Sequence, residues 1–411
     1  MTLIRTVPAA SAVPANTLVI DLDAVAANWR TLGSRSPAGV PCAAVVKADA
    51  YGLGASMVAP ALYHAGCRHF FVALVDEAVA LRPLLPRDAR LYVLHGALPG
   101  AEAECLDAGL TPVLNSLEQL RRWQQLARRR GAVLRAALQV DTGMARLGLA
   151  LSEALELDAG AIEGIEPVLW MSHLVGAENP DDPFNGEQLR RFSQLRRRWP
   201  RVPASLANSS GTFLGPDFHF ELLRPGAALY GVAPTVGRPN PMRAAVQLSA
   251  RMIQAHEIPA GQGVGYNHTW VAARPTRVAT VSVGYADGFL RSLSNRGVLY
   301  LGGHRAPLIG RVSMDMVSVD VTDVPAELIH PDASFELLGA GQDVNALATQ
   351  AGTNAYEILT SLGSRYRRVY RGDAQPGGDC PRPNAVRGVR PEESAIHGDM
   401  NPASRRAMNP H

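Results

Sequence analysis

Short apolar runs alternate with amphipathic helical patterns from about residue 17 to about residue 230. The runs lie at residues 40–47, 69–75, 91–96, 111–115, 133–143 and 167–174. Continuous apolar runs of this length are typical of strands that are buried on both faces, as in a parallel sheet. The repeated strand–helix unit therefore predicts an α/β fold, either a barrel or a doubly wound sheet.

Two of the intervening segments carry clear helix signals. Residues 116–130 begin with Ser116 and place Gln119 three residues later, which is the pattern of a capping box. Three arginines and then Gly131 end this segment, as suits a helix C-terminus. Residues 185–199 have a similar pattern, and we expect the arginines of both helices to face solvent.

Polar side chains follow several of the expected strands, at Lys47, His173, Asn208, Ser209 and Arg224. A (β/α)8 barrel of the TIM type gathers the C-terminal ends of its strands around one mouth. No GxGxxG follows the first strand, which disfavours a dinucleotide-binding doubly wound sheet. We therefore predict a TIM-type barrel over residues 17–240.

The sequence changes character after about residue 240. Runs rich in β-formers, separated by turn residues, occupy 276–286, 297–303, 305–324 and 333–339, and one helix is expected at 354–362. This pattern predicts a mainly β domain over residues 241–371. Residues 1–16 are interpreted as a loose leader. The Pro-, Gly- and Arg-rich residues 372–411 are expected to be disordered.

Composition narrows the classes of partner and compartment. The formal net charge is only +3 over 411 residues, which predicts no nucleic-acid partner. No apolar stretch approaches the roughly 20 residues that cross a bilayer, and the N-terminus lacks the apolar core of a signal peptide. Cys42, Cys67, Cys105 and Cys380 are far apart, so reduced thiols are favoured over two disulfides. We expect a cytoplasmic protein that needs no metal.

Lys47 ends a buried apolar run, where a lysine is costly unless it is paired, has a lowered pKa or is used covalently. Tyr51, Gly52 and Gly54 follow it and indicate a tight turn with a phenol close by. Such a turn suits a phosphate held beside the lysine amine. Taken alone, a lysine here is more often a surface lysine at a strand end.

The segment VVKADAYGLG resembles the cofactor-lysine motif of the alanine racemases, a barrel family that uses pyridoxal 5′-phosphate. Seven further segments resemble family motifs and occur in the family's order. They are DTGMARLG (141–148), SHLVGAE (172–178), ANSSG (207–211), RPGAALYG (224–231), GVGYNHTW (263–270), VGYADG (283–288) and RVSMDM (311–316). The resemblance covers roughly residues 17–370.

The resemblance implies a two-base interconversion of L-alanine and D-alanine, because racemisation needs a proton removed on one face of Cα and returned on the other. Lys47 carries the cofactor and serves the D-face, and Tyr285 serves the L-face. A chain from Tyr285 through His173 to Arg224 assists the phenol. In the family Tyr285 acts on the cofactor of the neighbouring subunit, which implies a homodimer.

Further roles follow from the same resemblance. Tyr51, Asn208, Ser209 and the backbone amides of Gly226 and Ala227 match the phosphate-binding positions. Arg224 faces the cofactor's ring nitrogen and, being always charged, cannot accept its proton, which restrains transamination.

The substrate carboxylate is assigned to Arg146 and to the Met314 amide, with Asp315 as support. Taken alone, these residues have ordinary structural interpretations. His173 could be a satisfied core histidine, Tyr285 a buried strand residue, and Ser209 part of a turn. Arg146 and Arg224 could form structural ion pairs.

Two positions depart from the family pattern. Many relatives carry a carbamylated lysine where this chain has Gln139, so a neutral amide must position Arg146. Many also carry a phosphate-binding tyrosine where Ser364 lies, and Ser364, Arg365 or Tyr366 could substitute for it. Both departures bear on the shape of the substrate pocket.

Three alternatives share some of these features. A broad-specificity racemase acting on Ser, Lys or Arg would differ only in pocket volume. A barrel-type decarboxylase that uses pyridoxal phosphate usually holds the ring nitrogen with an acidic residue, which Arg224 contradicts. A non-catalytic pyridoxal-phosphate-binding protein would lack the second domain. Supply of D-alanine for peptidoglycan is the expected role, and the sequence does not separate it from a catabolic one.

Overall fold

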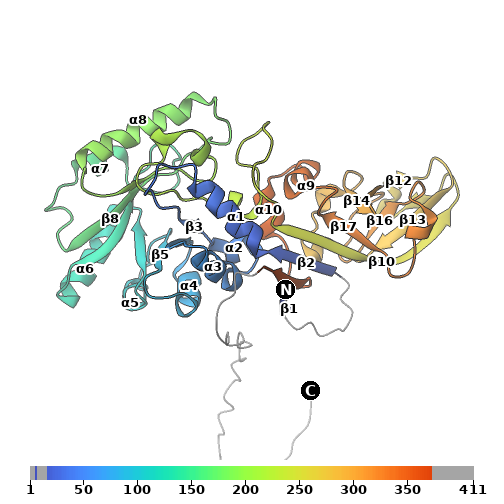
Figure 1. Cartoon of the computed structure of the whole chain (residues 1–411), viewed down its shortest axis with the longest axis horizontal. Helices are drawn as coiled ribbons and strands as arrows, with labels where there is room; N and C mark the ends of the chain where they lie inside the picture. Colours follow the sequence, from blue (N-terminus) through green and yellow to red (C-terminus); the bar gives the residue numbers. More distant parts are fainter. Residues whose placement is uncertain (1–4, 7–15, 373–411) are drawn as a thin grey trace, which may run out of the picture. The chain divides into compact units, whose positions relative to one another are not determined.

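The computed structural model describes residues 5–6 and 16–372. Most of the expected leader, nearly all of the expected disordered tail and Cys380 lie outside these residues. Figure 1 shows the arrangement of helices and strands along the chain.

The first part of the chain is built on a parallel sheet whose strands follow one another in chain order. These strands are β3 (Ala44–Val45), β4 (His69–Val72), β5 (Arg90–Val93), β6 (Thr111–Leu114), β7 (Leu134–Gln139), β8 (Ile165–Met171) and β9 (Ala204–Ser205). Each lies within or at the edge of a segment where the sequence predicts a strand, apart from β9. The strands are buried because helices cover the sheet.

Residues 221–225 close this sheet into a barrel. The Glu221 amide donates to the Ala204 carbonyl at 3.0 Å on the β9 side, and the Ala43 amide donates to the Leu223 carbonyl at 2.8 Å on the β3 side. The segment therefore takes the place of an eighth strand, and the predicted TIM-type barrel is confirmed.

Helices connect the strands. They are α1 (Leu22–Gly33), α3 (Ala55–His64), α4 (Val75–Leu81), α5 (Glu102–Asp107), α6 (Leu117–Arg130), α7 (Leu151–Glu156) and α8 (Pro183–Arg198). Short 3₁₀ helices occupy Arg82–Leu84, Gly211–Phe213, Pro216–Phe218, Ala227–Tyr230, Tyr266–His268, Tyr285–Asp287, Arg291–Leu293 and Ala326–Leu328.

Helix α6 confirms most of its predicted signals. Ser116 Oγ accepts from the Gln119 amide at 3.2 Å, and Gly131 ends the helix in the left-handed conformation with φ of 58°. The other half of the predicted capping box, a hydrogen bond from the Ser116 amide to the Gln119 side chain, is wrong. The Gln119 side chain instead accepts from the Asn115 amide and donates to the His95 carbonyl. Gln119 therefore ties α6 to the end of β5 rather than to its own cap.

The second sheet is mainly antiparallel. It contains β1 (Arg5–Thr6), β2 (Asn16–Asp21), β10 (Val246–Ile258), β13 (Thr276–Val281), β14 (Val298–Leu301), β15 (His304–Pro307), β16 (Val317–Asp320), β17 (Ser334–Leu338) and β18 (Arg367–Arg371). A small hairpin, β11 (Gly263–Val264) and β12 (Trp270–Val271), lies apart from it, and the helices are α9 (Val344–Ala351) and α10 (Ala355–Thr360).

Strand β2 joins this second sheet although it falls within the residues assigned to the barrel. It pairs antiparallel with β10 and parallel with β18. Its buried and partly exposed residues alternate, with Leu18 and Ile20 fully buried, which is the pattern of a strand with one exposed face. That period, rather than its position in the sequence, decides which sheet it enters.

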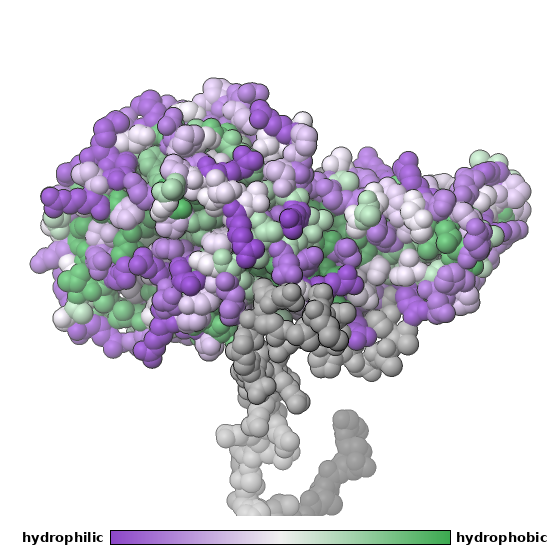
Figure 2. All heavy atoms as spheres, viewed as in Figure 1, coloured by the Kyte–Doolittle hydropathy of each residue, from purple (hydrophilic) through white to green (hydrophobic). Residues whose placement is uncertain are grey.

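One hydrophobic cluster runs through the barrel and continues into the second sheet. Hydrophilic residues cover much of the surface visible in Figure 2, with hydrophobic ones between them. No helix within the described residues has the length and apolar character needed to cross a membrane.

Candidate active site

Lys47 begins an unusual turn directly after β3. The segment α2 (Lys47–Gly52) is left-handed, with φ between 51° and 55° at the four residues 48–51. Residues with a side chain pay about 1–2 kcal/mol each for this conformation. Contacts from elsewhere must therefore hold the turn, as is common where strain supports a functional site.

Glu77, on α4, supplies one of these contacts. Its Oε1 accepts from the Ala48 amide at 2.7 Å, and its Oε2 accepts from the Ala73 and Leu74 amides at 2.7 and 3.2 Å. The carboxylate thereby fixes the backbone next to Lys47 against the end of β4. It also lies close enough to Lys47 to raise the pKa of that amine.

The second sheet supplies the other contacts. The Tyr370 hydroxyl donates to the Leu53 carbonyl at 3.0 Å, and the Arg368 guanidinium donates to the Gly52 carbonyl. Both residues lie on β18. The lysine-bearing turn is therefore held from the barrel and from the sheet that follows it.

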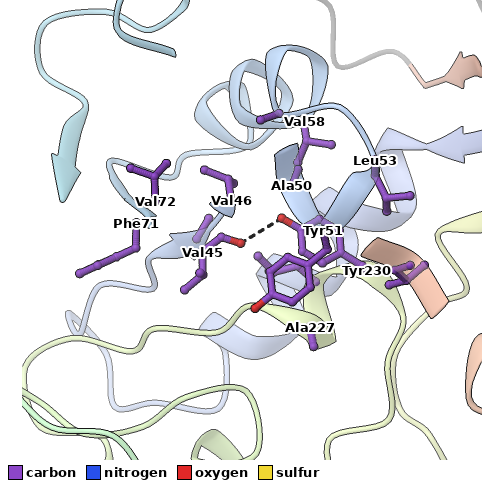
Figure 3. Close-up of a cluster of buried hydrophobic side chains, with 14 of the residues drawn as sticks. Val45, Val46, Ala50, Tyr51, Leu53, Val58, Phe71, Val72, Ala227 and Tyr230 are labelled. Carbon is purple, nitrogen blue, oxygen red and sulfur yellow. Dashed lines mark hydrogen bonds between the residues drawn. The ribbon is translucent and has the colours of Figure 1, made fainter. Parts of the chain in front are cut away.

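Tyr51 lies at the end of the turn and packs among aromatic side chains (Figure 3). Its ring centroid is 4.9 Å from that of Tyr230, whose hydroxyl donates to the Val45 carbonyl at 3.0 Å. The Tyr51 hydroxyl abuts Gly226, because a Cβ built there would overlap the phenolic oxygen. Burial raises the pKa of Tyr51 far above its usual value, so the phenol is a neutral donor.

The loop after β9 and the residues near Gly226 form a cluster of amides. Ser209 Oγ accepts from the Gly226 amide at 2.9 Å and from the Ala228 amide at 3.2 Å. Within the described residues, the amides of Ser209, Ser210 and Ala227 meet no acceptor. Free buried amides beside a hydroxyl are suited to bind a phosphate. The Gly226 amide is engaged by Ser209, and Asn208 Oδ1 caps the Gly211 amide at 2.8 Å.

Arg224 lies deep in the barrel with 3% of its surface exposed. Its Nε donates to Ser205 Oγ at 2.7 Å, and its Nη2 donates to the Ser172 and Leu206 carbonyls. No acidic side chain in the described part of the chain pairs with it, and Nη1 has no acceptor there. Burial lowers the pKa of Arg224 to about 10, so it stays charged at neutral pH.

His173 and Lys47 lie within electrostatic reach of two arginines. Burial, then Arg224, Arg146 and Lys47, lower the pKa of His173 to about 3. Burial, then Arg146, lowers the pKa of Lys47, and Glu77 works against this effect. The imidazole is therefore neutral. These residues concentrate positive charge with the Glu77 carboxylate nearby, which favours an anionic ligand.

Arg146 lies in a loop held by its neighbours. The Asp141 carboxylate accepts from the amides of Gly143, Met144 and Ala145 at 2.7, 2.8 and 2.8 Å. Gln139 Nε2 donates to the Leu147 carbonyl at 3.0 Å. Gln139 thus holds the loop through the backbone of the residue that follows Arg146. Within the described chain, no hydrogen bond joins the Gln139 and Arg146 side chains.

Tyr285 and Met314 lie together in two loops of the second domain, one after β13 and one between β15 and β16. The Tyr285 amide donates to the Ser313 carbonyl and the Ala286 amide donates to the Met314 carbonyl, both at 3.0 Å. Tyr285 is 45% exposed and Met314 is 53% exposed. In the portion of the chain that the structure describes, no hydrogen bond or ring contact joins Tyr285 to His173 or Lys47.

Two family models match the chain in sequence. The model for the N-terminal domain of alanine racemase matches residues 20–234, and the model for its C-terminal domain matches residues 245–370. The chain belongs to the alanine racemase family.

Individual relatives agree with this assignment. Alanine racemase of Rhodospirillum rubrum is 51% identical over 363 residues, which cover 88% of this chain and 97% of the relative. A catabolic alanine racemase of Agrobacterium fabrum is 49% identical, covering 88% and 92%. The crystal structure of alanine racemase from Bartonella henselae, with covalently bound pyridoxal phosphate, is 42% identical with a TM-score of 0.84, covering 87% of this chain and all of that one.

For an alanine racemase, the residues predicted from sequence fall into two groups in a single chain. The barrel group is Lys47, Tyr51, Arg146, His173, Asn208, Ser209, Arg224, Gly226 and Ala227. The group in the loops of the second domain is Tyr285, Met314 and Asp315. The barrel group fits pyridoxal phosphate, because free amides suit the phosphate, and Lys47, an amine of lowered pKa, begins the turn whose Tyr51 hydroxyl abuts Gly226.

Sequence reasoning missed several residues that build this site in the racemase chain. Glu77 holds the turn after Lys47, and its position three residues into α4 was the available signal, since a glutamate there caps a helix. Tyr230, also missed, supports Tyr51. Arg365, named above as one of three candidates for a phosphate contact, pairs with Asp287 and Asp315. No group of three or more His, Cys, Asp or Glu among residues 5–6 and 16–372 is arranged to hold a metal ion.

Proposed function

We propose that this chain interconverts L-alanine and D-alanine with pyridoxal 5′-phosphate held covalently on Lys47. The observation that carries the proposal is the position of the Lys47 amine. It stands on a strained turn whose Tyr51 hydroxyl abuts Gly226, and it lies within electrostatic reach of Arg146, His173 and Arg224. Family membership supplies the reaction, and this arrangement supplies the parts that it needs.

The cofactor, when bound, draws electrons from the substrate and so acidifies its Cα–H bond. The amides of Ser209, Ser210 and Ala227 and the neutral hydroxyl of Tyr51 would hold its phosphate. The Gly226 amide contributes by orienting the Ser209 hydroxyl, and Asn208 contributes by capping the Gly211 amide. Arg146 and the Met314 amide, supported by Asp315, would bind the substrate carboxylate, since an arginine is suited to bidentate carboxylate binding.

Arg224 directs the reaction towards racemisation. Its free Nη1 would face the cofactor's ring nitrogen while Nε and Nη2 stay bound to the barrel. A charged guanidinium cannot take up the ring proton that an acidic residue would stabilise. This favours fast return of a proton to Cα over transamination and speaks against a barrel-type decarboxylase.

Proton transfer is assigned to Lys47 on one face of Cα and to the partner subunit's Tyr285 on the other. The large exposure of Tyr285 and Met314 supports a homodimer with shared sites, as does the lack of a hydrogen bond or ring contact between Tyr285 and Lys47 in the described chain. Neutral His173, which carries one N–H, would donate a hydrogen bond to the oxygen of that phenol as the phenol loses its proton, and the nearby charge of Arg224 acts through His173. A tyrosine with a pKa near 10 needs such help to act as a base.

A panel of L-amino acids tests this proposal directly. Purified protein is incubated with L-alanine, L-serine, L-lysine or L-arginine, and the D-product is measured by chiral chromatography. We expect D-alanine to form fastest, and the visible absorbance of the lysine-bound cofactor to vanish in Lys47→Ala. Equal rates with lysine or arginine would instead support a broad-specificity racemase, and release of an amine and CO2 would support a decarboxylase.

We also propose that the enzyme supplies D-alanine for peptidoglycan from the cytoplasm. Three buried cysteines, Cys42, Cys67 and Cys105, are free, as suits a reducing compartment. Growth of a deletion strain tests the role. A requirement for added D-alanine is the expected result, whereas failure only on L-alanine as carbon source would indicate a catabolic role.

A further inference from the structure

Three segments of the second domain meet around the guanidinium of Arg365. Its Nε and Nη2 donate to the two carboxylate oxygens of Asp287 at 2.7 and 2.8 Å. Its Nη1 donates to Asp315 Oδ1 at 2.6 Å. One side chain therefore joins the turn that bears Tyr285 to the loop that bears Met314.

Asp287 depends on this arginine because its side chain is fully buried. Beyond Arg365, its Oδ2 accepts one backbone hydrogen bond, from the Gly284 amide at 2.9 Å. A buried carboxylate that loses its ion-pair partner is strongly destabilised. Asp287 closes the Tyr285 turn through its hydrogen bond from the Gly284 amide. Arg365 is thus required for this turn to keep its conformation.

The two loops that Arg365 joins are also packed directly against each other. Two backbone amides of the Tyr285 turn donate hydrogen bonds to the Ser313 and Met314 carbonyls. A side chain at Gly284 would overlap the Met314 carbonyl, so the two loops are in close contact there. The Gly363 amide donates to the Asp287 carbonyl at 3.0 Å, which brings the Arg365 segment onto the same turn. A displacement of one loop therefore moves the other.

We propose that Arg365 is a positioning residue for the racemisation, which fixes the Tyr285 phenol and the Met314 amide as one rigid unit facing the partner's cofactor. This inference rests on the proposed function, in which Tyr285 serves the L-face and Met314 binds the substrate carboxylate. Neighbouring Ser364 has no such link, and the buried Tyr366 hydroxyl has no hydrogen-bond partner within the described chain. Arg365 is therefore the residue of this segment that acts on the site.

The proposal predicts an asymmetric isotope effect. Tyr285 removes the Cα proton of the L-substrate, and Lys47 removes that of the D-substrate. If the phenol is displaced, its proton transfer slows relative to that of Lys47. The Cα-deuterium isotope effect on kcat/KM should then rise in the L-to-D direction and fall in the D-to-L direction. A merely structural loss of active enzyme would change neither.

The test uses the holoenzyme and the variants Arg365→Ala, Arg365→Lys and Asp315→Asn, with Arg251→Ala as a matched control. Arg251 forms an ion pair with Asp332 in the same domain, and this pair shares no residue with the ion pairs of Arg365. We expect Arg365→Ala to lower kcat/KM by about 10²-fold, as for misplacement of a reacting group by about 1 Å. It should also raise KM for alanine and shift the isotope effects as described, while the visible absorbance of the lysine-bound cofactor stays unchanged.

Arg365→Lys keeps the charge but cannot span both carboxylates, so it should show a smaller shift in the same direction. Asp315→Asn removes only the second arm and should raise KM with little change in the isotope effects. These two variants keep the proposal testable if Arg365→Ala does not fold. The proposal would be overturned if Arg365→Lys, and Arg365→Ala where that variant folds, kept the isotope effects and the KM of the wild type. If Tyr285→Phe also left racemisation intact, the proposed function itself would fail instead.

Discussion

Gly226→Ala is expected to weaken cofactor binding through a steric contact at the proposed phosphate site. The added Cβ would overlap Tyr51 Oη and lie 3.1 Å from Tyr51 Cζ. The φ of Gly226 is −128°, outside the left-handed region, so the contact with Tyr51 is the main effect. Tyr51 has little room to move, because it packs on Tyr230 and is 7% exposed.

The size of the effect follows from the cost of overpacking. Extra methyl groups in a packed site cost about 1–3 kcal/mol. If the strain is relieved by displacing Tyr51 and the Ser209 loop from the phosphate, the cofactor dissociation constant should rise between about 5-fold and about 150-fold.

The assay is a titration of cofactor-free protein with pyridoxal phosphate, followed by the visible absorbance of the lysine-bound form. Gly186→Ala on α8 is the matched control, since nothing lies within 4 Å of a Cβ there, and it should leave the constant unchanged. Combining Gly226→Ala with Tyr51→Phe should cost less than the sum of the single changes, because the overlapping oxygen is gone. An unchanged dissociation constant in Gly226→Ala, or strict additivity in the double variant, would refute the reasoning.

Three further predictions concern catalysis and pH. Tyr285→Phe should keep cofactor binding and lose racemisation by about 10²-fold or more, and unchanged turnover in both directions would refute its role as a base. Arg224→Glu should raise transamination relative to racemisation, measured as pyruvate release per D-alanine formed, and an unchanged ratio would count against the assignment of Arg224. Burial and nearby cations lower the pKa of His173 from 6.5 to about 3, so between these values the unfolded chain binds a proton that the folded chain does not. The free energy of unfolding of the cofactor-free protein should therefore fall as the pH drops from about 6.5 to about 3, with a shallower fall in His173→Gln; equal slopes in acid melts would contradict a neutral imidazole.

The barrel was predictable because its strands are apolar on both faces and its polar residues lie where strands end. Lys47, His173 and Arg224 each follow this rule. Strand β2 was not placed correctly, because its alternation extends over only six residues and its partners are more than 200 residues away. The local pattern was not recognised as a strand, and it could not have identified the sheet to which the strand belongs.

The conformation of the lysine turn was beyond sequence reasoning. Residues 48–51 include no glycine that would signal positive φ, and an alanine there prefers other conformations. Glu77 and Arg368 hold the turn from distant parts of the chain. Arg365 was named as one of three candidates for a phosphate contact, whereas its ion pairs join it to the loops that bear Tyr285 and Met314. Such long-range pairing leaves no local signal.

The account depends on Lys47 and the partner subunit's Tyr285 serving opposite faces of one cofactor. The most direct measurement co-expresses Lys47→Ala and Tyr285→Phe chains with different affinity tags and assays the purified heterodimer. Each homodimer variant lacks one base at both sites, whereas the heterodimer restores one complete site only if the two bases come from different chains. The account predicts about half of the wild-type activity per dimer, and a heterodimer as inactive as its parents would contradict it.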